Sequence, residues 1–550
     1  MGDSSKKRRG IRPAGLSRRR FLEVTGWGLA GTAALSKLDP REARAQAPGG
    51  GTVVVGMEAE SDVMDPHVAC CGLTYRVNRQ MFEGLVKEDL SRTDVPVPPI
   101  VPCLAASWTL SDDRRRYTFK IRPDVKFHDG TPLDAQAVKF NFDRFANKSA
   151  PQFYPKANAF TFYVIQFLEK TEAVDPSTVR ITLSKPFEPF LRIMCQSCGE
   201  PLMVSPAAIK KYGNDGLGDH PVGSGPFRFK ERVLGDRIVM ERNPEYWGSP
   251  ARSARLVWKP MPDPAARVAA LEQGAIDLAL AVPPDSVDLL KKMGYVVEIN
   301  RNIPHVWYLN FNMRDPVVKD RRVRQAIYMA INREEMCKAL LRGTCTPAWG
   351  LVPPGTEAYD PSFTGLGYNP QKAKALLAEA GYAKGLSTVM GTSVSGSGQI
   401  IPVPIMEWIK RDLEKVNVSV EIKSYEWLTW LRDWIGGLKP PMGAGQMSWG
   451  MSTDYWVYMT THSRFMPPKG VNVGWYSNPR VDALLDQVVQ TFDAAKRKQL
   501  YQEINRIVVL EDTGFLPIVN DAMPTAWSAK IQGFVLAPEW WWYMDTVRKA

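Results

Sequence analysis

Short β-strand patterns alternate with capped helices along most of this chain, and this alternation constrains its fold more than any other feature. Strand-like runs rich in Val, Ile and Thr lie at residues 52–55, 117–121, 178–183, 238–240 and 418–422. Asn369-Pro370 and Asn478-Pro479 mark helix starts, because Asn caps a first turn and Pro fits the first helical position. Strands that alternate with helices predict an α/β architecture.

The length of the chain predicts more than one lobe. Single hydrophobic cores rarely grow beyond about 250–300 residues, and this chain has 550 residues with no internal repeat. Its composition, 44% hydrophobic and 23% charged, is that of a globular protein. The 17 tryptophans fit two interpretations, large cores or the walls of a wide apolar cleft, and we expect both. The Gly/Ser/Thr-rich stretch 391–399 is predicted to be a surface loop.

The N-terminal segment has the three parts of a cleavable signal peptide. A basic region fills residues 1–23, a charge-free stretch spans residues 24–35, and Ala43-Arg44-Ala45 offers a cleavage site. The charge-free stretch is too short to cross a bilayer, which takes about 20 apolar residues. Residues 17–22, Ser-Arg-Arg-Arg-Phe-Leu, are close to the twin-arginine pattern, although Glu23 replaces the usual Lys. We therefore predict a Tat signal peptide at residues 1–45; a basic disordered arm is the alternative.

Removal of the signal peptide changes the charge of the chain. Residues 1–47 hold 11 Lys+Arg and 4 Asp+Glu, so the net charge falls from +12 to +5. This modest value gives no reason to expect nucleic acid as a partner. No apolar run after residue 47 is long enough to span a bilayer, and no Cys follows the apolar stretch to carry a lipid anchor. The sequence therefore predicts an exported, soluble protein.

The seven cysteines are an odd number, so at least one thiol stays unpaired in an oxidising compartment. Cys337 and Cys345 are eight residues apart and close enough in sequence to bridge. Cys195 and Cys198 have the spacing of one metal-ligand pair, but a zinc site needs a second pair, and none has a convincing spacing. Structural disulfides are favoured over a redox pair.

The sequence gives no pattern typical of an enzyme. None of the five histidines, His67, His128, His220, His305 and His462, has a second His at metal-ligand spacing. Residues 223–225 read Gly-Ser-Gly and do not form a G-x-S-x-G elbow. His128 falls in a predicted turn, followed by Asp134 as a helix cap. We predict no catalytic residue, no metal ion and no cofactor; a secreted hydrolase is the distant alternative.

Seven sequence blocks stand in one order along the chain. They are Leu-Ala-Ala-Ser-Trp at 104–108, Val-Lys-Phe-His-Asp-Gly-Thr-Pro at 125–132, and the blocks at 222–227, 241–247, 267–277, 320–333 and 476–485. In this order they resemble the family 5 extracellular solute-binding proteins, which serve ABC transporters for oligopeptides, dipeptides and nickel. The resemblance covers nearly all of residues 52–522. One block alone is a weak signal, whereas the ordered set is specific.

The resemblance implies a two-lobed periplasmic binding protein of the type II-like class, cluster C. Lobe I would comprise residues 48–303, with an inserted subdomain at about 75–200, and the returning segment 523–550. Lobe II would comprise residues 304–522. The ligand, a peptide-like or other small organic solute, would be engulfed between the lobes and delivered to an ABC permease in the inner membrane. The family also implies a monomer and no catalytic activity.

The resemblance raises a specific question about peptide transport. Peptide-binding relatives hold the α-ammonium with an Asp three residues after a Trp. The matching Trp is Trp449; the third residue after it is Ser452, and the fifth is Asp454. Either the loop is shifted so that Asp454 binds the ammonium, or the site is missing. A buried ammonium without a carboxylate would be costly, so an ordinary peptide ligand is in doubt.

Alignment with the family predicts further ligand contacts, each with core packing as its alternative. The predicted set is Glu58, His67, Trp307, Tyr308, Asn310, Trp349, Trp449, Ser452, Asp454, Tyr455 and Trp456. Their broad aromatic faces with single polar groups suit varied ligands. Some relatives bind nickel complexes or haem, and His67 or His462 would serve there. A receptor for a nickel complex, another metal complex or haem is therefore the alternative function.

Overall fold

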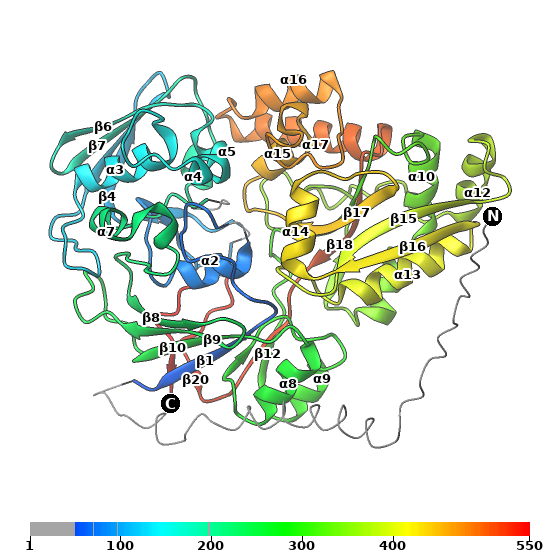
Figure 1. The fold of residues 1–550 in the computed structure, drawn as a ribbon. Helices are drawn as coiled ribbons and strands as arrows, with labels where there is room; N and C mark the ends of the chain where they lie inside the picture. Colours follow the sequence, from blue (N-terminus) through cyan, green and yellow to red (C-terminus); the bar gives the residue numbers. More distant parts are fainter. Residues whose placement is uncertain (1–49, 70, 96, 196–198) are drawn as a thin grey trace, which may run out of the picture. The chain divides into compact units, whose positions relative to one another are not determined.

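A seven-stranded sheet contains the first strand of the described chain and a strand from its C-terminal part (Figure 1). The computed structural model describes residues 50–69, 71–95, 97–195 and 199–550, so the signal-peptide prediction lies outside the described residues. The sheet order is β12-β19-β11-β1-β10-β9-β8. Its strands are β1 (Thr52–Met57), β8 (Phe227–Val233), β9 (Arg237–Arg242), β10 (Arg255–Pro260), β11 (Leu278–Ala279), β12 (Val296–Glu298) and β19 (Thr525–Trp527). Strand β1 forms because alternate residues Val53, Val55 and Met57 are buried.

Helices α8 (Pro264–Glu272) and α9 (Val287–Lys292) pack against this sheet. Leu271 of α8 and Leu290 of α9 share a small hydrophobic cluster with Ala279 of β11 and Ala526 of β19. The hairpin strands β20 (Ile531–Gln532) and β21 (Arg548–Lys549) follow β19. The C-terminal segment is thus held in the same sheet and core as strand β1.

A separate four-stranded sheet lies within the first half of the chain. Its order is β4-β5-β7-β6, with β4 (Ala105–Leu110), β5 (Arg116–Ile121), β6 (Leu168–Asp175) and β7 (Thr178–Leu183). The neighbouring elements are α2 (Gly72–Asn78), β2 (Val86–Glu88), β3 (Ile100–Pro102), α3 (Ala135–Ala146), α4 (Pro155–Phe160), α5 (Phe162–Ile165), α6 (Phe190–Ile193) and α7 (Pro206–Gly216). The predicted cap of α3 is confirmed, since the Asp134 carboxylate accepts from the Ala137 N–H.

The prediction that His128 is a turn residue is also confirmed. Its Nε2 lies 3.0 Å from the Gly225 carbonyl oxygen, and its Nδ1 lies 3.3 Å from the Gly223 nitrogen. Burial lowers the pKa of His128 to about 4. The ring is therefore neutral and joins two turns through hydrogen bonds.

A six-stranded sheet forms the second lobe, in the order β14-β18-β13-β17-β15-β16. Its strands are β13 (Val306–Phe311), β14 (Cys345–Pro347), β15 (Leu386–Ser393), β16 (Val418–Tyr425), β17 (Met442–Trp449) and β18 (Phe515–Asp521). Its helical elements are α10 (Arg321–Ala330), α11 (Arg333–Glu335), η3 (Met336–Leu340), α12 (Pro370–Glu379), α13 (Pro402–Glu414), α14 (Trp427–Ile435), α15 (Tyr455–Thr461), η4 (Ser463–Phe465), α16 (Pro479–Val488), α17 (Ala494–Arg506) and η5 (Ile507–Glu511). Every residue of β13 is buried, as expected of a central strand.

Two connections join the sheets. The chain leaves the seven-stranded sheet after Glu298 and enters the six-stranded sheet at Val306. It returns between Asp521 and Thr525. We use lobe I for residues 50–303 and 523–550, and lobe II for residues 304–522. Among the described residues no helix is both long enough and apolar enough to cross a bilayer.

The predicted helix starts are confirmed, and the predicted loop at residues 391–399 is partly wrong. Asn369 and Asn478 cap α12 and α16 through their side-chain oxygens. Residues 391–393, however, are buried at the end of β15. Glycine at position 391 permits this, because a Cβ there would lie 2.6 Å from the Trp430 ring. Trp430 packs closely on the strand and covers Gly391. A Gly/Ser/Thr-rich composition does not predict this contact.

Candidate ligand-binding site

One pocket of about 90 Å³ takes its walls from both lobes and is called the tryptophan pocket below. Lobe I contributes Cys71, Gly72, Tyr75, Trp540 and Trp541. The first connection contributes His305, and lobe II contributes Ser397, Trp427, Leu431, Trp434, Ile435, Met447, Ser448, Trp449, Gly450 and Val471. The five tryptophans make it mainly an aromatic cavity with few polar groups, as ligand sites commonly are.

The lobe I wall is fixed by a buried arginine. Arg76 of α2 donates from Nε to the Trp540 carbonyl oxygen at 2.6 Å and forms a 2.7 Å ion pair with Glu58. Its guanidinium also lies 5.5 Å from the centre of the Trp540 ring and 4.8 Å from that of Trp542. These contacts link α2 to the C-terminal segment, so Glu58 positions the pocket wall through Arg76.

The lobe II wall is one face of α14. Trp427, Leu431 and Trp434 are spaced i, i+4 and i+7, which places them on the same side of a helix. The helix begins there because the Glu426 carboxylate accepts hydrogen bonds from the N–H groups of Leu428 and Thr429. Trp430 comes three residues after Trp427 and therefore lies beside the same face; it turns towards β17, where its indole N–H donates to the Gln446 carbonyl.

His305 joins the two walls at the first connection. Its Nδ1 lies 2.9 Å from the Ser448 hydroxyl, and its ring centre lies 4.0 Å from that of Trp540. Burial and the nearby charge of Arg76 hold the pKa of His305 well below its usual value, so the ring is neutral. A Cβ at Gly450 would overlap the Pro304 carbonyl, which explains why glycine follows Trp449.

The polar groups of the tryptophan pocket are mostly donors. Within the described residues, its lining contains no Asp, Glu, Lys or Arg. The indole N–H groups of Trp427, Trp434, Trp540 and Trp541 are buried and have no hydrogen-bond partner. A buried donor without a partner costs about 1–3 kcal/mol. The pocket therefore favours uncharged groups with flat faces and hydrogen-bond acceptors.

Of the predicted contact residues in the described chain, Trp449 alone lines this pocket. His67 is fully buried elsewhere in lobe I, with Nε2 2.9 Å from the Leu202 carbonyl oxygen and Nδ1 2.8 Å from Arg144. Burial lowers the pKa of His67 to about 3. Trp307, Tyr308 and Asn310 are buried in β13, where the Tyr308 ring packs on Trp456 and Phe515. Trp349 borders a different cavity, beside α17.

The two polar candidates after Trp449 contact protein groups. Ser452 donates from its hydroxyl to Oε1 of Glu88, a lobe I residue, at 3.2 Å. Oδ2 of Asp454 accepts from the Ala358 N–H at 3.1 Å, within lobe II. Burial raises the pKa of Asp454 to about 7. Neither residue lines the tryptophan pocket, and their ligand roles stay predictions.

Several contacts away from the pocket also join the lobes. The Tyr455 hydroxyl contacts Gln166, and its ring centre lies 5.4 Å from that of Phe187. Arg497 of α17 lies 3.3 Å from Glu188 of lobe I and 2.5 Å from Glu357 of lobe II. The predicted contact residue Tyr455 thus packs where the two lobes touch.

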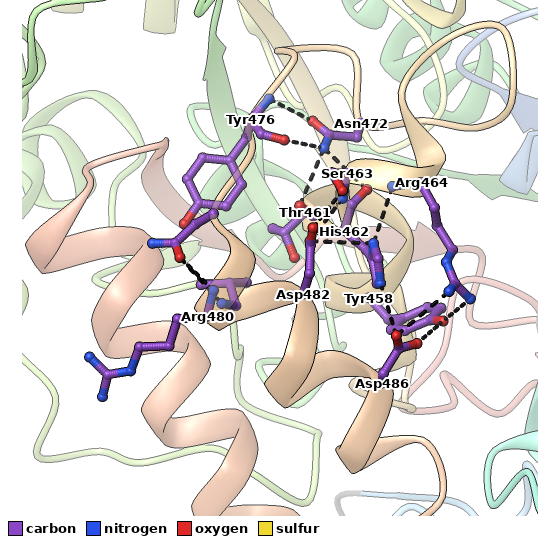
Figure 2. Close-up of polar contacts among 12 residues, drawn as sticks. Tyr458, Thr461, His462, Ser463, Arg464, Asn472, Tyr476, Arg480, Asp482 and Asp486 are labelled. Carbon is purple, nitrogen blue, oxygen red and sulfur yellow. Dashed lines mark hydrogen bonds and ion pairs between the residues drawn. The ribbon is translucent and has the colours of Figure 1, made fainter.

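His462, the other histidine considered for a metal complex, belongs to a local polar network (Figure 2). Its Nδ1 accepts from the Arg464 N–H and lies 3.3 Å from Asp482, while Nε2 lies 3.7 Å from Asp486. Burial lowers the pKa of His462. In the described part of the chain, no three His, Cys, Asp or Glu side chains are grouped so that they could hold a metal ion.

Comparison with known proteins identifies the class. Residues 99–467 match the family model for bacterial extracellular solute-binding proteins, family 5 Middle. The glutathione-binding protein GsiB of Escherichia coli O1:K1 / APEC is 31% identical over 501 residues, which cover 88% of this chain and 92% of that protein. GsiB of Escherichia coli strain K12 is 30% identical with the same coverage.

Solved structures agree with this result. The dipeptide-binding protein from Pseudoalteromonas sp. SM9913 in complex with Met-Leu matches with a TM-score of 0.82 and 26% identity, covering 91% of this chain and all of that one. DppA from Helicobacter pylori, in complex with the peptide STSA, has a TM-score of 0.81, 24% identity and coverage of 91% and 98%. The chain belongs to the family 5 bacterial extracellular solute-binding proteins. Its role is that of the substrate-binding subunit of an ABC importer, and the predicted two-lobed α/β fold is confirmed.

Sequence reasoning missed most of the pocket. Trp427 and Trp434 had a usable signal, because they lie seven residues apart on one face of a predictable helix. The run Trp540-Trp541-Trp542 was a second signal. Nothing in the sequence places these two segments against each other.

Proposed function

We propose that the protein binds a peptide-like or other small organic solute in the tryptophan pocket and delivers it to an ABC permease in the inner membrane. We further propose that the part of the solute inside this pocket is uncharged and carries hydrogen-bond acceptors. The observation that carries the proposal is a pocket walled by both lobes and lined by five tryptophans, with no charged side chain among its described lining residues.

The walls from two lobes support a clamshell mechanism. A solute between α14 and the Trp540-Trp541 segment contacts both lobes, so its binding energy favours their closed arrangement. Typical pockets for small ligands measure about 300–1,000 Å³, well above the 90 Å³ of this one. Entry of a solute therefore requires the lobes or the tryptophan side chains to move apart. The two connections, each with a proline, are placed to act as hinges.

The donor-rich lining supports the proposed ligand chemistry. Carbonyl, amide or ether oxygens would satisfy the indole N–H groups, and a flat or apolar body would pack on the rings. An ammonium group inside this pocket would have no carboxylate in its described lining. The relatives are named for glutathione and dipeptide binding, which supports a solute with peptide-like carbonyl groups.

The proposal extends to the cellular setting. Residues 1–45 would act as a twin-arginine signal peptide, and the mature protein would be a periplasmic monomer without a catalytic role. The protein would dock on the permease, and the solute would leave it when the lobes open there.

Identification of a retained solute tests the function. We would purify the mature protein without denaturation, record its native mass spectrum, then release and identify the bound molecule. A neutral solute, or one with a neutral acceptor-bearing end, supports the proposal. A free-N-terminal peptide whose binding depends on its ammonium would contradict the uncharged-ligand part, and a metal chelate or haem would establish the alternative function.

A further inference from the structure

Two cysteine side chains meet beside the second connection between the lobes. Cys337 lies in η3 and Cys345 is the first residue of β14. Their Sγ atoms are 2.9 Å apart, and both residues are buried. Unbonded carbon atoms pack at about 3.5–4.0 Å, and sulfur is larger than carbon. The two sulfur atoms are therefore already closer than ordinary packing contact.

The backbone brings the two cysteines together without help from their sulfur atoms. The Leu341 N–H donates to the Met336 carbonyl at 3.0 Å, and the Gly343 N–H donates to the Cys337 carbonyl at 2.9 Å. Arg342 and Gly343 have φ values of 47° and 75°, which reverse the chain before β14. A disulfide between Cys337 and Cys345 would therefore link the two ends of a turn that backbone hydrogen bonds already hold.

We infer that Cys337 and Cys345 form a disulfide in the exported protein. Family 5 solute-binding proteins are extracellular, and disulfides persist in that oxidising setting. The two S–H bonds break and one S–S bond forms. The two electrons and two protons pass to an accepting disulfide, on a thiol–disulfide oxidase or in oxidised glutathione, which becomes two thiols.

The bond would secure an edge strand at the second connection. Cys345 pairs with Asp521 across β14 and β18, and Asp521 is the last residue of β18 before the chain returns to lobe I. The contact with Cys337 and burial raise the pKa of the Cys345 thiol. Because the thiolate is the reactive form, we expect the exchange to occur while this segment is locally open.

The other described cysteines provide internal controls. Cys71 contacts the Thr74 hydroxyl, Cys103 contacts Glu83 and Cys195 contacts the Leu191 carbonyl.

Trypsin cuts after Lys338 and Arg342, so Cys337 and Cys345 fall on different peptides. A disulfide between them joins residues 334–338 to the peptide that begins at Gly343.

The experiment is peptide mapping of the mature protein, exported by its own signal and alkylated in denaturant without reductant. We expect the joined peptide, with Cys337 and Cys345 protected from alkylation until reduction. Alkylation of both residues without reduction, or a bond from either to another cysteine, overturns the inference.

A second measurement covers the stability of the protein. We expect dithiothreitol to lower the Tm of the wild type by a few degrees, because a cross-link restricts the unfolded chain. The double variant Cys337→Ser/Cys345→Ser should have a Tm that dithiothreitol does not change. An equal response of wild type and double variant contradicts the inference, and the peptide map stands even if the variant folds poorly.

Discussion

The hydroxyl of Ser452 in lobe II lies 3.2 Å from Oε1 of Glu88 in lobe I. The sequence resemblance predicts that Ser452 takes the position of the Asp with which peptide-binding relatives hold the α-ammonium. Glu88 also contacts Arg192 at 3.0 Å. Burial, with the neighbouring charge of Glu88, holds the pKa of Glu539 well above its usual value. The Ser452 hydroxyl therefore lies at a position where an Asp would add a third carboxylate to the buried Glu88 and Glu539.

We expect Ser452→Asp to destabilise the protein at neutral pH by about 1–3 kcal/mol, because it adds a buried like charge beside Glu88. The loss should shrink towards pH 4, where the new carboxylate is protonated. Urea unfolding at several pH values measures this, with Ser452→Asn as the uncharged control. Equal stability of both variants at pH 8, together with new affinity for peptides with a free N-terminus, would contradict this prediction and show that an Asp at position 452 can bind the peptide ammonium.

We expect Trp434→Leu to reduce solute binding about ten-fold or more, because it removes an aromatic wall and a donor from the tryptophan pocket. Trp349→Leu is the matched control, since Trp349 borders the cavity beside α17. Calorimetry with the solute released from the wild type measures both affinities. A larger effect at Trp349 would move the binding site to that cavity.

We expect Glu58→Gln to cost about 3–5 kcal/mol of stability, because it leaves the buried Arg76 guanidinium without its carboxylate. Trp540 should become more mobile, since Arg76 holds its carbonyl. Denaturant unfolding gives the first quantity, and indole fluorescence reports the second. Asp94→Asn breaks the exposed pair with Arg92 and should leave the stability nearly unchanged, because exposed ion pairs contribute little.

The raised pKa of Asp454 predicts that the stability of the protein depends on pH. Its pKa is raised by burial to about 7, from 3.8. The Asp454 carboxyl therefore binds more proton in the folded protein than in the unfolded chain between these values, and the stability that it contributes falls as pH rises from about 4 to 7. We expect Asp454→Asn to flatten this fall and to be more stable than wild type at pH 8, by on the order of 2 kcal/mol. The two proteins should match at low pH, and the exposed Asp285→Asn variant should follow the wild type. Lost solute binding in Asp454→Asn would instead favour Asp454 as a ligand contact.

Export offers a test that depends on the sequence alone. Replacing Arg18 and Arg19 by Lys should leave the precursor in the cytoplasm, because the twin-arginine route requires both. Cell fractionation and the molecular mass of the retained protein measure the outcome. Normal appearance of the mature protein in the periplasm would reject the Tat prediction.

The sequence by itself determined the elements whose causes are local. Asp134, Asn369 and Asn478 cap helices as predicted, because a cap needs only a side-chain oxygen and the next turn of backbone. The order of the sequence blocks determined the family, since the blocks fall on turns, strands and helix starts of one fold.

Tertiary structure alone decided which aromatic residues meet a cavity. Trp307 and Tyr308 have the composition of a pocket wall, but β13 is covered on both faces, so they pack in the core. Trp434 and Trp540 lie more than one hundred residues apart and line one pocket, because α14 and the C-terminal segment meet there. Periodicity shows that a face is apolar; only the element packed against it decides whether that face is core or cavity.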